Sequence, residues 1–160
     1  MILSKLDMFC WKKPMGSSAG TVYTDALDFG TGGNAALEPS GVVFKTAGHH
    51  GDDVLRALSF SLWVAVAAAD TSLTVTWETS DNEPTAGTAN SDASKADLRT
   101  WSLTAAQLAA GEFPIKAEAL PNGLKRYNRL KITTTAGSDT GVSTKVFPTL
   151  SAFILDGRDA

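Results

Sequence analysis

The sequence predicts an all-β protein, a jelly roll or β-sandwich of about eight antiparallel strands with one short helical turn. Apolar and polar residues alternate over several short segments, as they do in strands that bury one face. Clusters of Gly, Pro, Asn, Asp and Ser, which favour turns, separate these segments. Strands do not alternate with long helical patterns, so we expect two antiparallel sheets packed face to face rather than a parallel α/β sheet.

The clearest core strand spans residues 58–66, where every second residue is apolar. Residues 73–77 repeat this pattern, and residues 70–72 are expected to join the two strands as a hairpin. Trp77 shares the apolar parity of its strand and is expected in the core. Trp63 lies on the opposite parity, so it belongs either to a second packed layer or to an exposed surface.

The remaining strands have weaker patterns. Residues 12–20 are expected to connect the first two. The expected strands cover residues 1–9, 22–29, 98–103, 113–117, 127–135 and 142–155, the last broken at Pro148, which cannot donate to a central ladder.

Specific residues in the sequence predict the start of one helix and the position of one turn. Thr104 followed by Gln107 is a capping box, and Gly111 is expected to end a short helix in the left-handed conformation. Residues 121–123, Pro-Asn-Gly, predict a tight turn, because Pro fixes φ and Gly accepts a positive φ.

A chain of 160 residues is long enough for one domain with a buried core, and we expect residues 1–160 to form a single domain. Two loops interrupt it. Residues 31–53 are expected to form a long excursion with one short strand, and residues 80–97 a polar surface loop.

The net charge is −3, and Lys and Arg do not form the patch that nucleic-acid binding requires. The longest apolar run, residues 62–69, is far shorter than the ~18 residues that suggest a membrane span. We therefore expect no nucleic-acid partner, no membrane partner and no cleavable signal. Cys10 is the only cysteine, so it forms no intrachain disulfide, and we expect a buried thiol in a reducing compartment.

The two histidines, His49 and His50, are the first candidates for a metal site, with Asp52 and Asp53 nearby. Neighbouring side chains of a strand point in opposite directions, so adjacent histidines do not easily chelate one ion. A solvated loop flanked by glycines is the favoured interpretation, and we expect no metal and no cofactor.

No catalytic constellation is visible, since the sequence has no G-x-S-x-G elbow and no phosphate-binding loop. We therefore expect no enzyme activity. Lys125, Arg126 and Arg129 form a local basic group. We interpret it as a solvated strand edge, with acidic residues of a neighbouring subunit as partners, rather than as a phosphate site.

Trp11 and Trp63 are the tryptophans most open to a surface role. Trp11 follows Cys10 beside two lysines at a strand end. Large aromatic side chains on a surface favour partner binding, and they also form platforms for sugars. Ordinary packing is the alternative for both residues.

Several segments, in order through most of the chain, resemble the capsid cement (decoration) proteins of tailed bacteriophages, of the type first seen in a short-tailed Bordetella phage. The matching segments are residues 1–9, 23–30, 72–81, 106–113, 120–130 and 151–156. Their order and spacing carry the resemblance, because each segment alone is a common β fragment. Two regions depart from the family pattern: the excursion at residues 31–53 is longer, and Cys10-Trp11-Lys12 replaces polar positions.

The resemblance implies a structural virion protein, a jelly-roll domain on the outer capsid surface that bridges neighbouring major capsid proteins and stabilises the head. The major capsid protein and a second copy of the chain are the implied partners, as a homodimer or alternatively a trimer. Such a protein is made in the cytoplasm of the bacterial host. A carbohydrate- or receptor-binding β-sandwich of a phage particle is the alternative function, and a small hydrolase is the third hypothesis. The candidate interface residues are Trp11, Trp63, Phe44, His49, His50, Arg126 and Arg129.

Overall fold

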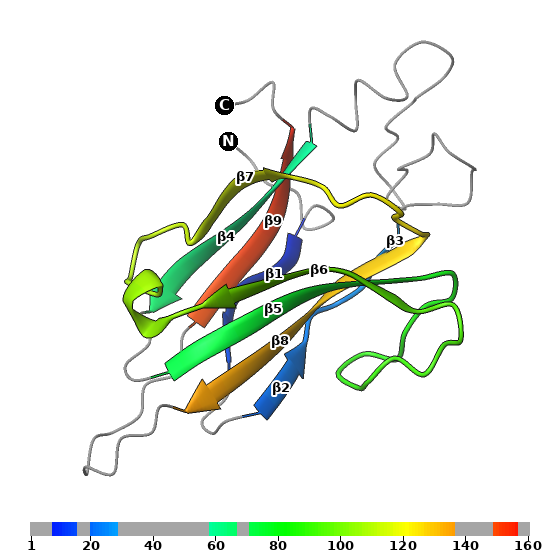
Figure 1. Ribbon diagram of the computed structural model, residues 1–160, viewed down its shortest axis with the longest axis horizontal. Helices are drawn as coiled ribbons and strands as arrows, with labels where there is room; N and C mark the ends of the chain where they lie inside the picture. The colour runs from blue at the N-terminus through cyan, green and yellow to red at the C-terminus, as the bar shows by residue number, and fades with distance from the viewer. Residues whose placement is uncertain (1–7, 16–19, 29–57, 67–70, 137–148, 157–160) are drawn as a thin grey trace.

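The structure is a computed structural model that describes residues 8–15, 20–28, 58–66, 71–136 and 149–156. These residues form nine strands and one 3₁₀ helix (Figure 1). In chain order they are β1 (Met8–Pro14), β2 (Gly20–Tyr23), β3 (Leu27–Asp28), β4 (Leu58–Val66), β5 (Thr71–Ser80), β6 (Ala96–Leu103), η2 (Ala105–Gln107), β7 (Ile115–Ala119), β8 (Tyr127–Ala136) and β9 (Thr149–Asp156).

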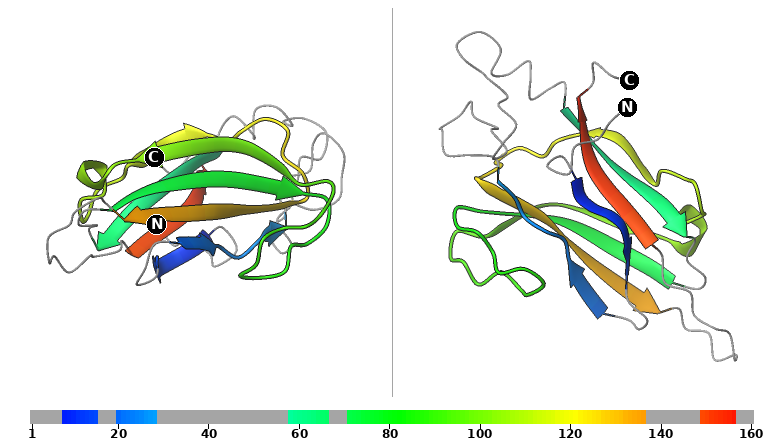
Figure 2. Two further views of the ribbon diagram at one scale, coloured as in Figure 1. Left: turned by 60° about the horizontal axis from the view of Figure 1, so that its bottom comes forward. Right: turned by 180° about the vertical axis from the view of Figure 1, so that it is seen from behind.

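The strands form two antiparallel sheets that pack face to face, as Figures 1 and 2 show. Sheet A has the order β1-β9-β4-β7. Sheet B has the order β2-β8-β5-β6, and β3 also pairs with β8. The predicted all-β sandwich is therefore confirmed. Within the described residues, no helix has both the length and the apolar character needed to cross a membrane.

The predicted hairpin between residues 58–66 and 73–77 is wrong. β4 pairs with β7 and β9 in sheet A, whereas β5 pairs with β6 and β8 in sheet B. The apolar side chains of both strands point into the same core, but from opposite sheets. The alternation of apolar and polar residues is the same in this arrangement as in a hairpin, so the sequence pattern cannot distinguish the two. From β4 onward the chain changes sheet at every connection except β5–β6. The jelly-roll connectivity remains a prediction, which these crossings support.

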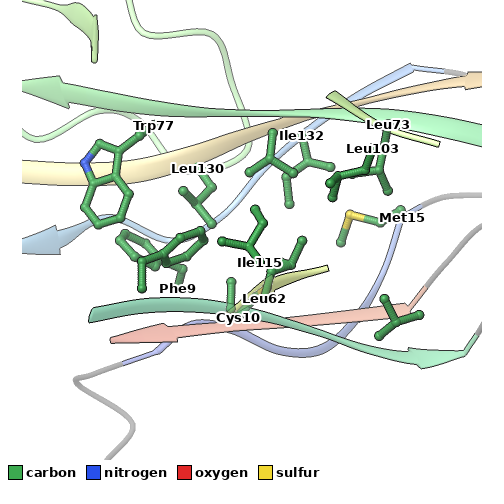
Figure 3. Packing of buried hydrophobic residues seen from close by; sticks show 14 of the residues in the cluster. Phe9, Cys10, Met15, Leu62, Leu73, Trp77, Leu103, Ile115, Leu130 and Ile132 are labelled. Atoms are coloured by element: carbon green, nitrogen blue, oxygen red, sulfur yellow. The ribbon is translucent and has the colours of Figure 1, made fainter. Parts of the chain in front are cut away.

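Aromatic rings from both sheets meet in the core (Figure 3). The ring of Trp77 on β5 lies 4.9 Å from that of Phe9 on β1 and 5.4 Å from that of Phe60 on β4, both in edge-to-face contact. Trp77 is fully buried, as predicted, and its Nε1–H donates to Asn128 Oδ1 at 3.0 Å. The one polar atom of the central side chain is therefore satisfied within the core.

The first strand ends later than the predicted residue 9. β1 covers Met8–Pro14, and residues 1–7 lie outside the described part. Its register against β9 shifts twice, so the side chains do not alternate regularly between the two faces of the sheet along the strand. For this reason residues 12–14 lack the sequence pattern of a strand. Cys10 is buried, as predicted, and this burial raises the pKa of its thiol to about 11.

Both edge strands of sheet A carry a β-bulge closed by a serine. Two residues of β1, ending at Lys12, face Ser151, and two residues of β7, ending at Ala117, face Ser61. Lys12 and Ala117 have positive φ angles of 44° and 48°. The Lys12 N–H donates to Ser151 Oγ at 2.8 Å, and the Ala117 N–H donates to Ser61 Oγ at 3.0 Å. A buried serine hydroxyl thus replaces the ladder carbonyl that each bulge removes.

The segment before β7 adds a further bulge. Gly111, at a φ of 85°, donates its N–H to Val64 O at 2.8 Å, and Val64 donates its own N–H to Glu112 O at 3.0 Å. Gly111 therefore extends the edge of sheet A and does not end the helix, which stops at Gln107. The predicted capping interaction is present, because the Thr104 N–H donates to Gln107 Oε1 at 2.9 Å.

The bulges also explain why the alternation expected over residues 113–117 fails. Only Ile115 is buried, Ala117 occupies the bulge, and Phe113 is 42% exposed. Each bulge inserts one residue and so reverses the side-chain parity beyond it.

Replacing Ser61 by Ala is expected to lower the free energy of unfolding by about 1–3 kcal/mol, because the Ala117 N–H loses its buried acceptor. Ser102 lies exposed on β6, and Ser102→Ala is the matched control, with an expected change within about 0.5 kcal/mol. Urea unfolding of both variants measures the difference. Equal midpoints would show that the bulge does not depend on the serine.

Candidate partner interface

The structure separates the predicted interface residues. Phe44, His49 and His50 lie outside the described residues, as does the side chain of Trp11, whose backbone belongs to the β1 bulge. Trp63 is half-buried on the outer face of sheet A, opposite in parity to its buried neighbours.

Arg126 and Arg129 belong to the other sheet of the sandwich. Arg126 directly precedes β8 and Arg129 lies within it. The structure therefore does not bring Trp63 and the two arginines to one surface.

The prediction that Arg129 is a strand-edge group is wrong. β8 lies between β5 and the β2 and β3 strands, and Arg129 is 1% exposed. Its Nε donates to Glu78 Oε2 at 2.9 Å, directly across from it on β5. Its guanidinium also lies 4.3 Å from the centre of the Tyr23 ring. The sequence contained the basic residue but gave no signal of the buried carboxylate opposite.

Glu78 connects Arg129 to a longer chain of charges. Its Oε1 lies 3.3 Å from Lys95 Nζ, which in turn lies 3.1 Å from Asp97 Oδ1. Partial burial opposes the charged form of Lys95, but the carboxylates of Asp97 and Glu78 together raise its pKa above the ordinary value. Two cations and two anions alternate in this cluster, so it is neutral as a whole. Arg129 Nη2 is nevertheless buried without a hydrogen-bond partner.

Arg126 also finds its carboxylate within the chain. Its Nε and Nη2 donate to the two oxygens of Asp28 at 2.9 and 2.8 Å, a bidentate pair that fixes β3 against the start of β8. This hydrogen bonding raises the pKa of the Arg126 guanidinium. Neither arginine therefore requires the acidic partner on a neighbouring subunit that the sequence suggested.

The polar loop predicted at residues 80–97 connects β5 to β6 and is largely exposed (Figure 1). Its base is closed by Asp92, whose Oδ2 accepts from the Asn82 N–H at 3.1 Å and whose Oδ1 accepts from the Ser94 N–H at 2.7 Å. Lys125 Nζ joins the two sides, 3.1 Å from Asp81 Oδ2 and 2.6 Å from Ser94 O. The strands extend further than predicted, so the loop itself covers residues 81–95.

Side chains close the two open sides between the sheets. On one side, Glu118 of β7 forms an ion pair with Arg99 and accepts from Trp101 Nε1 at 3.1 Å, both on β6. On the other side, Lys13 Nζ of β1 donates to the Tyr23 carbonyl of β2 at 3.0 Å. A partner would therefore meet the outer faces and the loops of the sandwich rather than its interior.

The outer face of sheet B, away from the charged cluster, carries rows of hydroxyl groups. One row crosses all four strands through Thr21, Thr133, Thr74 and Ser102. The hydroxyls of Thr21 and Thr133 lie 3.0 Å apart and bond to each other. The row that defines this hydroxyl face carries no charge, and Lys131 lies on the same side of β8 between the row and the ionic cluster.

The described residues contain no group of three His, Cys, Asp or Glu side chains that could hold a metal ion. No family model matches the chain, and no curated protein matches it. The surfaces described above are the Trp63 face of sheet A and the Arg126 side and hydroxyl face of sheet B.

Glu78→Gln is expected to destabilise the fold by about 3–5 kcal/mol, because Arg129 would keep a buried charge without its carboxylate. Arg129→Met is expected to cost less, since Glu78 retains Lys95. Arg126→Met, whose side chain is 38% exposed, is the matched control and is expected to cost the least of the three, because solvent screens an exposed ion pair. Denaturant unfolding of the three variants gives the order, and a larger loss for Arg129→Met would contradict this account.

The base of the 81–95 loop is expected to resist acid. Hydrogen bonds from the backbone and side chains of Ser94 and Asn82 lower the pKa of Asp92 from 3.8 to about 2. The folded pKa lies below the unfolded one, so the stabilising contribution is complete above about pH 4 and is lost as the pH falls through about 2.

An NMR titration of the Asn82 and Ser94 amides measures this transition. Its midpoint is expected near 2, and it is expected to disappear in Asp92→Asn. A midpoint near 3.8 would show that the carboxylate does not hold the loop base in solution.

Proposed function

We propose that the chain is a structural virion protein, a capsid cement protein that binds the outer capsid surface and bridges neighbouring major capsid proteins. The ordered series of segments that resembles this family motivates the proposal. The structural observation that supports it is the closed sandwich: the edge strands of sheet A are bulged, and side chains close the open sides between the two sheets. Such a domain presents stable faces to a partner, and the bulged strands β1 and β7 and the short strand β2 leave β6 as its one long edge strand among the described residues.

Cementing a shell is a mechanical task that this architecture suits. A contact of standard size buries about 1,600 Å² in total. A homodimer, or alternatively a trimer, would hold two or three capsid subunits at once, and each contact would raise the effective concentration of the next.

The outer face of sheet A is the first candidate for the contact with the capsid. Trp63 lies on it, half-buried, on β4 next to the bulged edge strand β7. Tryptophan is enriched at the energetic centres of protein interfaces because it buries a large area with little loss of side-chain freedom. The Arg126 side of sheet B is the alternative contact surface.

Purified protein mixed with capsids that lack it tests the proposal directly. Electron microscopy of the mixture is expected to show added density on the outer shell at symmetric positions. Absence of density on the shell, together with measurable binding to glycans, would overturn the cement function and favour the carbohydrate- or receptor-binding alternative.

Trp63→Ala is expected to weaken capsid binding at least tenfold, the loss that corresponds to about 1.4 kcal/mol of binding free energy. The free energy of unfolding of the isolated chain is expected to change by less than about 2 kcal/mol.

Trp101→Ala is the matched control for this prediction. Trp101 is also half-buried, and its ring packs 5.2 Å from that of the core residue Phe60. Its truncation is expected to cost about 3–5 kcal/mol of stability. Equal losses of stability in the two variants would mean that Trp63 is a core residue rather than a contact.

A further inference from the structure

Asn122 and Gly123 form an exposed turn that carries the chain from β7 in sheet A to β8 in sheet B. Gly123 has a φ of 80°, as the predicted Pro-Asn-Gly turn requires. In the part of the chain that the structure describes, neither the Asn122 side chain nor the Gly123 N–H makes a hydrogen bond. The amide nitrogen and the side-chain carbonyl that lie next to each other in the chain are therefore both uncommitted.

This pair of groups has the chemistry for an intramolecular reaction. The backbone nitrogen that follows an asparagine is positioned to attack the side-chain carbonyl carbon and form a five-membered ring. A side chain on the following residue hinders that attack, and glycine has none. A hydrogen bond on either group, or burial away from water, would oppose the reaction.

We propose that Asn122 is a self-modification site, at which the chain converts Asn122 spontaneously to aspartate and isoaspartate. The Gly123 nitrogen forms a bond to Asn122 Cγ, the Cγ–Nδ2 bond breaks, and ammonia leaves with the proton from the Gly123 amide. Water then adds to one of the two carbonyl groups of the cyclic imide and breaks one carbon–nitrogen bond. The net reaction consumes one water and releases one ammonia, with no oxidant or cofactor.

Other described asparagines provide an internal comparison. Asn128 is fully buried, its Oδ1 accepts from Trp77, and its Nδ2 donates to the Lys125 carbonyl at 2.7 Å. Asn90 Oδ1 accepts from the Asp92 N–H at 2.9 Å. The residues that follow Asn128, Asn90 and Asn82 are Arg, Ser and Glu, none of which leaves the backbone nitrogen as open as glycine does. The reaction is therefore expected to be selective for Asn122.

The site matters for the fold because of its position. The isoaspartate product moves one methylene group from the side chain into the backbone and so lengthens the connection between the sheets. Both products add a negative charge three residues before Lys125, whose ammonium holds Asp81 and Ser94 at the base of the 81–95 loop. The modification does not depend on the proposed capsid function.

The test incubates the folded full-length chain, its Asn122→Gln variant and a synthetic peptide of residues 119–125 at neutral and mildly alkaline pH. Peptide mapping by mass spectrometry follows the replacement of the amide by a carboxyl group at each asparagine. Residue 122 of the folded chain is expected to convert within about tenfold of the peptide rate, faster at the higher pH. A tenfold slowing corresponds to about 1.4 kcal/mol of added barrier.

Asn122→Gln is expected to show no conversion at residue 122 in the same period, because glutamine would have to form a six-membered ring. Matching thermal unfolding of the variant and the parent chain would show that both are folded. Complete conversion of the peptide with none in the folded chain would overturn the proposal. Conversion of Asn128 as fast as Asn122 would overturn its selectivity.

Discussion

The structure depends on the pairing of β5 with β8 at two successive positions. Trp77 opposite Leu130 faces the core, and Glu78 opposite Arg129 faces outward. One position provides the aromatic contacts that join the two sheets, and the next provides a buried ion pair on the outer side of sheet B. A register slip of one residue would place the charges in the core and the tryptophan outside, so these pairs specify the register as well as stabilise it.

Three of the four described edge strands, all except β6, limit unwanted strand pairing. Sheet A ends in two bulged strands, and β2 in sheet B has only four residues. The hydroxyls of Ser61 and Ser151 satisfy the bulged backbone, so the distortion leaves no buried amide unpaired at these positions. A protein that must associate with a partner in one defined way benefits from edges that do not accept other strands.

Side-chain parity was sufficient to predict the class of the fold and several elements, including β4 at its observed bounds and the burial of Trp77. Side-chain parity did not predict β1 and β7 correctly, because a bulge in each strand interrupts the alternation. It also does not indicate which strands pair with each other. The interface residues were harder, because Arg129 looked like a surface residue until its partner Glu78 was placed opposite it. The burial of a charged pair depends on contacts between residues that are distant in the sequence. A local sequence pattern holds no information about such contacts.

The position of β9 has a consequence for how the chain folds. This strand, residues 149–156, lies between β1 and β4 in the interior of sheet A, although it is the last strand described. During synthesis, sheet A cannot be completed until residues 149–156 have left the ribosome, and β1 and β4 have no partner between them until then. All the described strands of sheet B come before β9 in the chain, and this sheet holds the one pairing of consecutive strands among those described, β5 with β6. We therefore expect sheet B to form first. The nascent chain then keeps an apolar sheet face open until residues 149–156 emerge, and it is most exposed to aggregation during this interval.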